Sequence, residues 1–183
     1  FPGAMPYNKE ELIMNYDLHL VLDGLGIALF SAKKMEYVTP GSDFFTAEFD
    51  NPKQIAAHPN QGDITAFCTG SGGDFDLHFL SGAPSAEILE QYPVSVRLGL
   101  EVQGGSIQVC DVYWLMKWDA NFPQEQIIPL EDGFYEITVC TRLPESGYWG
   151  EDQTIYLFFE KAEHMPELSW RGIPDLFTED EEE

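Results

Sequence analysis

Apolar and polar residues alternate most regularly between Val94 and Val102. Aliphatic side chains recur at every second position and share one face, while polar residues or glycine occupy the other. This pattern predicts a half-buried strand, and burial of each aliphatic side chain contributes about 1.5–3 kcal/mol before conformational entropy is subtracted. A slip of one residue would expose the whole set, so the pattern specifies the register strongly. The aliphatic residues are Val94, Val96, Leu98, Leu100 and Val102.

Two hairpins are predicted in the second half of the chain. The glycine turn Gln103–Gly105 is followed by Ser106–Trp118, whose apolar residues fall on both faces and indicate a strand covered on both sides. We expect this strand to pair with the preceding one. A second hairpin is expected between Phe134–Arg142 and Gln153–Lys161, which a polar loop connects.

Further short strands are predicted upstream, separated by turns rich in glycine, proline and aspartate. Only Ser85–Gln91 resembles a helix, and no alternation of strands with long helices occurs. The pattern predicts a mostly β protein, an antiparallel β-sandwich of jelly-roll or Greek-key type with at most one or two short helices. The additional strand candidates are Leu12–Leu22, Ile27–Val38, Phe44–Phe49, Asp63–Cys68 and Asp74–Leu80.

The length of 183 residues favours one domain. Residues 1–5 resemble a remnant of an expression tag, and residues 6–163 are expected to form a single β-sandwich domain. From His164 the periodicity is lost, and residues 164–183 are predicted to be an irregular acidic tail that ends in five acids.

The chain carries 32 Asp and Glu against 9 Lys and Arg, a net charge of −23. Nucleic acid and anionic membrane surfaces are excluded as favoured partners, because their binding relies on clusters of Lys and Arg. A basic protein is the partner that this field would attract. The alternative is that the acidity serves solubility alone.

The three cysteines have no paired spacing that would indicate a metal site or a disulfide framework. We expect Cys68, Cys110 and Cys140 to be reduced and to pack as small hydrophobic residues, which favours a cytoplasmic location. The sequence contains no long apolar run, and no motif of a nucleotide, metal or hydrolase site. We therefore predict no cofactor and a protein that is not an enzyme.

One group of side chains has metal-binding potential. Period-two alternation places Asp74, Asp76 and His78 on one face of a strand, and Asp17 and His19 share a face of another. If the two strands are neighbours, these residues could bind a divalent cation through nitrogen and oxygen ligands. A metal-binding β-domain or metal-dependent enzyme is thus the alternative function, although plain solvent-facing strands show the same alternation.

Acids and exposed aromatic residues concentrate in the turn and the loop that flank the strand 134–142. Their charge suits a basic partner, and the Tyr-Trp pair inside a polar loop could also line a carbohydrate or small-ligand site. The candidate partner-binding residues are Glu131, Asp132, Glu145, Tyr148, Trp149, Glu151 and Asp152.

The same region carries a family resemblance. The pattern Leu130-x-x-Gly133-x-Tyr135-x-Ile137-Thr138, with Thr141, Pro144 and then Asp152-x-Thr154-Ile155-Tyr156, resembles the C-terminal hairpin of the competence-associated nuclease inhibitors of bacteria and of acidic, immunity-like bacterial β-proteins. The resemblance covers about thirty residues and transfers no binding residue. It implies an inhibitor or immunity-type protein that covers a basic nuclease or toxin and needs no catalytic group.

Overall fold

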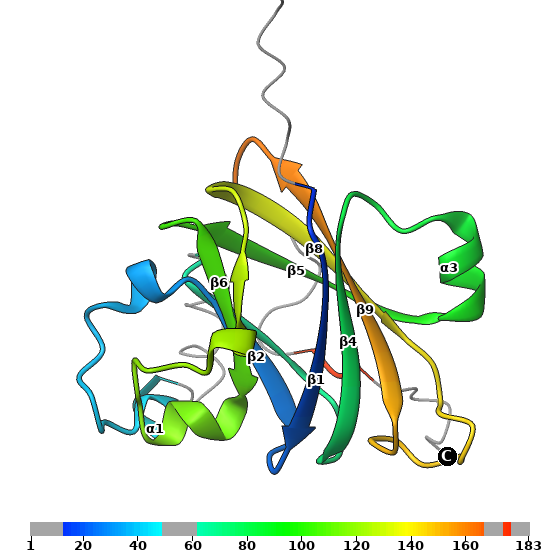
Figure 1. Cartoon of the computed structure of the whole chain (residues 1–183), viewed down its shortest axis with the longest axis horizontal. Helices are drawn as coiled ribbons and strands as arrows, with labels where there is room; N and C mark the ends of the chain where they lie inside the picture. The colour runs from blue at the N-terminus through cyan, green and yellow to red at the C-terminus, as the bar shows by residue number, and fades with distance from the viewer. Residues whose placement is uncertain (1–12, 49–61, 167–173, 177–183) are drawn as a thin grey trace, which may run out of the picture.

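Two β-sheets stacked face to face form the protein (Figure 1). The computed structural model describes residues 13–48, 62–166 and 174–176. The five-stranded sheet has the order β1 (Asn15–Leu22), β4 (Gly73–Ser81), β9 (Gln153–Ala162), β8 (Gly133–Thr141) and β5 (Val94–Val102). The four-stranded sheet has the order β3 (Ile64–Cys68), β2 (Gly26–Phe30), β6 (Ser106–Asp111) and β7 (Ile127–Pro129). The predicted mostly β sandwich is confirmed, with one parallel pair, β4 with β9, among antiparallel pairs.

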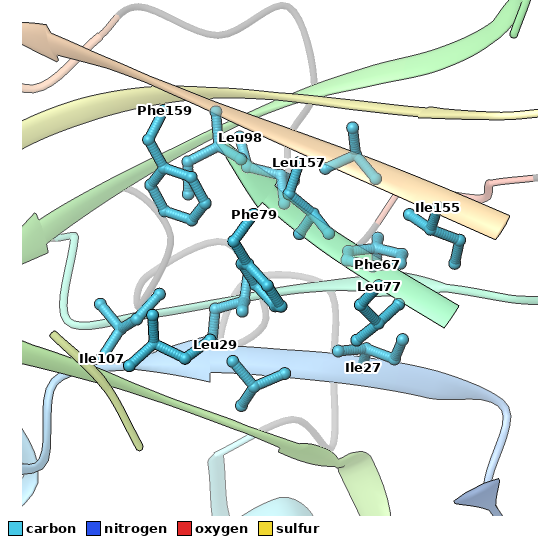
Figure 2. Close-up of a cluster of buried hydrophobic side chains, with 14 of the residues drawn as sticks. Ile27, Leu29, Phe67, Leu77, Phe79, Leu98, Ile107, Ile155, Leu157 and Phe159 are labelled. Atoms are coloured by element: carbon cyan, nitrogen blue, oxygen red, sulfur yellow. The ribbon is translucent and has the colours of Figure 1, made fainter. Parts of the chain in front are cut away.

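The core lies between the two sheets. Alternate residues of the five-stranded sheet point inward, so Leu77 and Phe79 of β4 and Leu157 of β9 are fully buried. Figure 2 shows them facing Ile27 and Leu29 of β2 across the core. The alternation seen in the sequence of β5 has the same origin, because its inward aliphatic residues join this cluster.

The four-stranded sheet is covered on its second face as well. Phe30 of β2 and Cys110 of β6 pack there in a second apolar cluster with Trp118. Burial on both faces explains why β2 is a continuous apolar run in which all five residues are buried. The covering elements are η1 (Ala32–Met35), α1 (Phe44–Glu48) and η2 (Val112–Met116), and η3 (Gln124–Gln126) precedes β7.

Three of the predicted strands were too long or of the wrong type. The strand predicted over Ser106–Trp118 ends at Asp111, whose carboxylate accepts the Tyr113 N–H at 3.0 Å and caps η2. The strand predicted over Ile27–Val38 ends at Phe30 and continues into η1. The segment from Phe44 forms α1, which begins where the Asp43 carboxylate accepts the Thr46 N–H at 2.9 Å.

The two predicted hairpins had different outcomes. The hairpin of β8 and β9 is confirmed by their antiparallel pairing. The hairpin of β5 and β6 is wrong, because β5 pairs with β8 and β6 pairs with β2 and β7 in the other sheet. Residues 103–105 therefore cross from one sheet to the other, and the local turn carries no information about that choice.

The predicted helix is present as α3 (Ala86–Gln91), and the Ser85 hydroxyl accepts the Ile88 N–H at its start. It lies on the outer face of the five-stranded sheet, where Ile88 and Tyr92 pack against Phe158 of β9 and Cys140 of β8. With α1 it makes two short α-helices among the described residues, within the expected number.

Part of the predicted tail packs on the domain. Cys68 of β3 forms a bridge with Asp175, and Leu176 is fully buried in the core between the sheets. The proposed tag remnant and the acidic residues 179–183 lie outside the described residues, and the domain limits stay predictions. Within the described part of the chain, no helix is long and apolar enough to cross a membrane.

Candidate functional site

The loop between β8 and β9 is anchored by buried polar groups. Thr141, at the end of β8, donates its hydroxyl to the Thr154 carbonyl at 2.7 Å and accepts the Gln153 side-chain N–H at 3.0 Å. The Gln153 side-chain carbonyl in turn accepts the Gly150 N–H at 2.8 Å. Thr141 and Gln153 are fully buried, so these bonds are shielded from water and hold both ends of the loop.

The loop is also docked against the turn that precedes β4. The Ser71 hydroxyl donates to the Trp149 carbonyl at 2.8 Å, and the Asp74 N–H donates to the Gly150 carbonyl at 2.8 Å. The backbones approach so closely that a Cβ atom on Gly73 would lie 2.0 Å from the Gly150 oxygen. Contacts of this kind leave the backbone of the loop little freedom around Trp149 and Gly150.

Acidic side chains and an aromatic ring project from this anchored loop. Tyr148 is 71% exposed and Trp149 is half-buried. A pocket of about 390 Å³ is lined by Glu145, Glu151 and Asp152 of the same loop, with Arg142 as its basic residue. The predicted loop residues therefore do lie together, on a rigid support.

The two predicted Asp and His strands are neighbours. β1 and β4 pair antiparallel, with Asp17 opposite His78 and His19 opposite Asp76. His78 Nδ1 lies 2.5 Å from Asp17 Oδ1, and His19 Nδ1 lies 2.8 Å from Asp76 Oδ1. His19 Nε2 also lies 3.4 Å from Asp74 Oδ1, so both ring nitrogens face carboxylates.

These contacts determine the protonation of His19. The hydrogen bond to Asp76 is the largest effect that raises its pKa above 6.5, and Asp74 adds to it, while partial desolvation opposes it. With a carboxylate at each ring nitrogen, the imidazolium can donate from both nitrogens. The His19 contacts thus favour an ion pair with Asp76 and Asp74 on an exposed surface. Among the residues described, no group of three or more His, Cys, Asp or Glu could hold a metal ion, and the metal-binding hypothesis stays a prediction.

The loop and the Asp-His strands form one surface, although the sequence pattern predicted two separate sites. β4 and β9 run parallel, and Asp76 lies opposite Thr154, which lines the acidic pocket of the loop. Both residues are on the outer face, because their neighbours Leu77 and Ile155 point into the core. We call this surface the acidic face, and it comprises Asp17, Asp74, Asp76, Glu145, Glu151 and Asp152.

An aromatic row that the sequence analysis missed borders the acidic face. The His78 and Tyr156 rings are 4.9 Å apart between centroids, and Tyr156 and Tyr92 are 4.8 Å apart. The Arg142 guanidinium lies 4.6 Å from the centroid of Tyr92 in a cation–π contact. The position of Tyr156 on the polar face of β9 was the one sequence signal for this aromatic row. Tyr92 follows α3, and no local pattern in the sequence links it to the sheet.

Two predicted partner-binding residues lie away from the acidic face. Glu131 forms an ion pair with Lys161 at 3.0 Å, and Asp132 accepts the backbone N–H groups of Gly104 and Gly105 at 3.3 and 2.7 Å. Both precede β8, whereas the loop follows it. The nine residues of β8 at ~3.3 Å each separate the two sites by about 30 Å. Their contacts support the turns between the sheets.

No family model and no curated protein sequence matches the chain. Two solved structures share its fold. One, described as crocagin biosynthetic gene J, has a TM-score of 0.53 and 15% sequence identity, over 80% of this chain and 97% of that one. The other is ComJ, inhibitor of the DNA-degrading activity of NucA from Bacillus subtilis, with a TM-score of 0.51 and 14% identity, over 82% and 99% of the two chains. The resemblance to the competence-associated nuclease inhibitors is thereby confirmed at the level of the fold.

Proposed function

We propose that this protein is a non-enzymatic, cytoplasmic bacterial inhibitor that binds a basic protein, a nuclease in the first instance, through its acidic face. The proposal rests on one observation: six carboxylates share a surface whose loop is held by buried hydrogen bonds. A rigid acidic surface can occupy a groove built for phosphate without any catalytic chemistry. The fold that the chain shares with ComJ supports the same conclusion.

Electrostatics would dominate the association. Charge complementarity raises association rates toward about 10⁸–10⁹ M⁻¹s⁻¹ at low salt and makes them fall as salt is added. Tyr148 adds a large, exposed contact in the same loop as these acids, and tyrosine is a residue type that often anchors an interface. Arg142, held over Tyr92, limits how deeply a basic side chain could enter the pocket.

A nuclease assay with matched charge variants tests the proposal. The probe is a basic nuclease of the NucA type from the same bacterium, and DNA degradation is measured with increasing amounts of this protein. Wild-type protein should inhibit at a one-to-one ratio. The triple variant Glu145→Gln, Glu151→Gln, Asp152→Asn should inhibit about 10–100-fold more weakly, mainly through a slower association. Asparagine suits position 152 because Asp152 has a φ of +49°, which Asn also tolerates.

The control variant replaces three exposed acids outside the acidic face, Glu36→Gln, Glu125→Gln and Glu163→Gln. Its net charge equals that of the loop triple variant. It should inhibit within about threefold of wild type, because it loses only long-range attraction to the basic partner, which salt screens. Equal losses in the two triple variants would mean that net charge, and not the acidic face, drives binding. Absence of inhibition by the wild-type protein would contradict the proposed function itself.

A further inference from the structure

A second surface of the protein lies along the edge of the five-stranded sheet. β1 is the terminal strand of that sheet, and its strand partner among the described residues is β4. Figure 1 shows β1 beside β4 of its own sheet. A terminal strand leaves every second backbone N–H and C=O group directed outward, which makes it a template for another strand.

A groove lies at the C-terminal end of this edge, where Leu20, Val21 and Asp23 line it. Leu20 of β1 points into the sandwich and Val21 points out of it, yet both line the same cavity of about 440 Å³. A cavity that contacts both sides of one strand lies along the strand's edge. Tyr113 and Trp114 of η2 and Gln126 of η3 form the opposite wall. The Tyr16 hydroxyl donates to the Glu125 carbonyl at 2.8 Å and joins the start of β1 to η3.

The groove is flanked by exposed apolar side chains. Val21 is 62% exposed and Tyr113 52%, and Leu25 and Met116 are exposed in the same two segments. Asp111 holds these segments together, because its carboxylate accepts the N–H groups of Asp23, Gly24 and Tyr113. A fixed group of exposed apolar residues beside an open edge is typical of an interaction surface.

The charges at the edge are acidic. Asp17 lies on the outward face of β1, and Asp23 and Asp119 line the groove. Lys117 is the basic residue of its lining. Proteins commonly guard an open edge with lysine or proline, and the sequence of β1, NYDLHLVL, contains neither. A second copy of this chain is a poor occupant, because each copy carries a net charge of −23.

We propose that β1 accepts an extended, basic segment of a protein partner as an additional strand. Residues of the added strand that point inward would place apolar side chains in the groove beside Leu20 and Trp114. Residues that point outward would place lysine or arginine beside Asp17 and Asp23. Backbone hydrogen bonds supply affinity in this mode, and the alternating pockets supply specificity. This surface shares Asp17 with the acidic face but does not include the loop Glu145–Asp152, and the proposal does not require a nuclease as the partner.

The probe is a fluorescent peptide as long as β1, 8 residues, in which valine alternates with lysine and threonine. Binding is measured by anisotropy at about 0.15 M salt, where long-range attraction is largely screened. Hydrogen exchange of the β1 amides is measured with and without peptide. The same peptide carrying N-methyl groups on all of its backbone amides keeps its charge and side chains but has no N–H donor on either edge and cannot form the strand pairing.

The variant Val21→Lys should weaken peptide binding by at least about tenfold, because it removes apolar contact and repels the lysines of the peptide. Leu89→Lys on α3 is the matched control, since Leu89 is also an exposed apolar residue and the substitution adds the same charge. Leu89→Lys should bind as wild type does. The wild-type complex should slow exchange of the β1 amides, and the N-methylated peptide should fail to bind.

Three results would overturn the proposal: no binding of the peptide, equal binding of its N-methylated form, or equal binding by Val21→Lys. A concentration-dependent dimer that Val21→Lys abolishes would also overturn it, by assigning the edge to a second copy of this chain. The nuclease assay is independent of this result, because its variants lie in the loop and the peptide experiment contains no nuclease.

Discussion

The backbone N–H of Asp74 donates to the carbonyl of Gly150 at 2.8 Å, and this bond ties the first acid of β4 to the loop between β8 and β9. It joins segments that lie more than seventy residues apart, as does the nearby bond from Ser71 to Trp149 with its separation of 78 residues. Through this junction the loop acids and the Asp-His strands become one surface. The stability of the junction therefore determines whether the acidic face keeps its shape.

Substitution of Gly73 by alanine should be strongly destabilising. The φ of Gly73 is +140°, and an added Cβ would lie 2.0 Å from the Gly150 oxygen, a backbone atom that cannot rotate away. We expect the free energy of unfolding to fall by about 2–5 kcal/mol, from backbone strain and steric overlap together. Urea unfolding followed by fluorescence measures it. Gly82→Ala is the control, since Gly82 has a φ of +96° and no atom within 4 Å, and a loss as large as that of Gly73→Ala would contradict the role of the contact.

Thr141→Val should cost about 1–3 kcal/mol, because it leaves the Gln153 side-chain N–H and the Thr154 carbonyl without their buried partner. The comparison is Thr138→Val on the outer face of the same strand, which we expect to cost less than about 1 kcal/mol. Denaturant unfolding of both variants gives the difference. Equal costs would mean that the network around Gln153 contributes nothing specific to the loop.

His19 should titrate above 6.5, and Asp76→Asn should lower its pKa, because the Asp76 hydrogen bond is the largest effect that raises it. A pKa raised by folding means that protonated His19 stabilises the folded state. This contribution is complete below pH 6.5 and is lost as the pH rises through the folded pKa. NMR titration of the ring proton measures the pKa directly.

The control for this titration is Asp17→Asn, which removes the carboxylate beside His78 and should leave His19 nearly unchanged. If Asp76→Asn and Asp17→Asn lowered the pKa of His19 equally, the general negative field of the protein would raise that pKa, and not the pairing of His19 with Asp76 across β1 and β4.

The thiols should react slowly in the folded protein. Burial raises the pKa of Cys68 to about 11, with a further contribution from Asp175, and burial alone raises the pKa of Cys140 to about 11. Cys110 is completely buried, and its pKa is raised as well. Near pH 8 the thiolate fraction is therefore very small, and the thiolate is the reacting form. Ellman's reagent should label little in buffer and all three cysteines after unfolding in urea; rapid labelling in buffer would contradict the burial.

Much of the fold was predictable because it depends on local alternation. The period of two in β5, β8 and β9 specifies which residues face the core. Cys140 and Phe158 on the outer face are buried as well, because Tyr92 and Ile88 pack on them. The turns around Gly133 and the helix start at Ser85 carry their own residue signals. The strand ends at Phe30 and Asp111 were missed, because apolar residues that continue into a covering helical turn look like a longer strand.

The sequence alone determined which side chains are acidic, which face of each strand they occupy, and that the loop after β8 exposes Tyr148. Only the tertiary structure decided that β5 and β6 belong to different sheets, that β4 runs parallel to β9, and that Asp76 therefore lies beside Thr154. These pairings join distant segments, and their choice depends on how two apolar faces fit together in the core. No local pattern encodes that fit, so the acidic face as one surface could be found only in the folded chain.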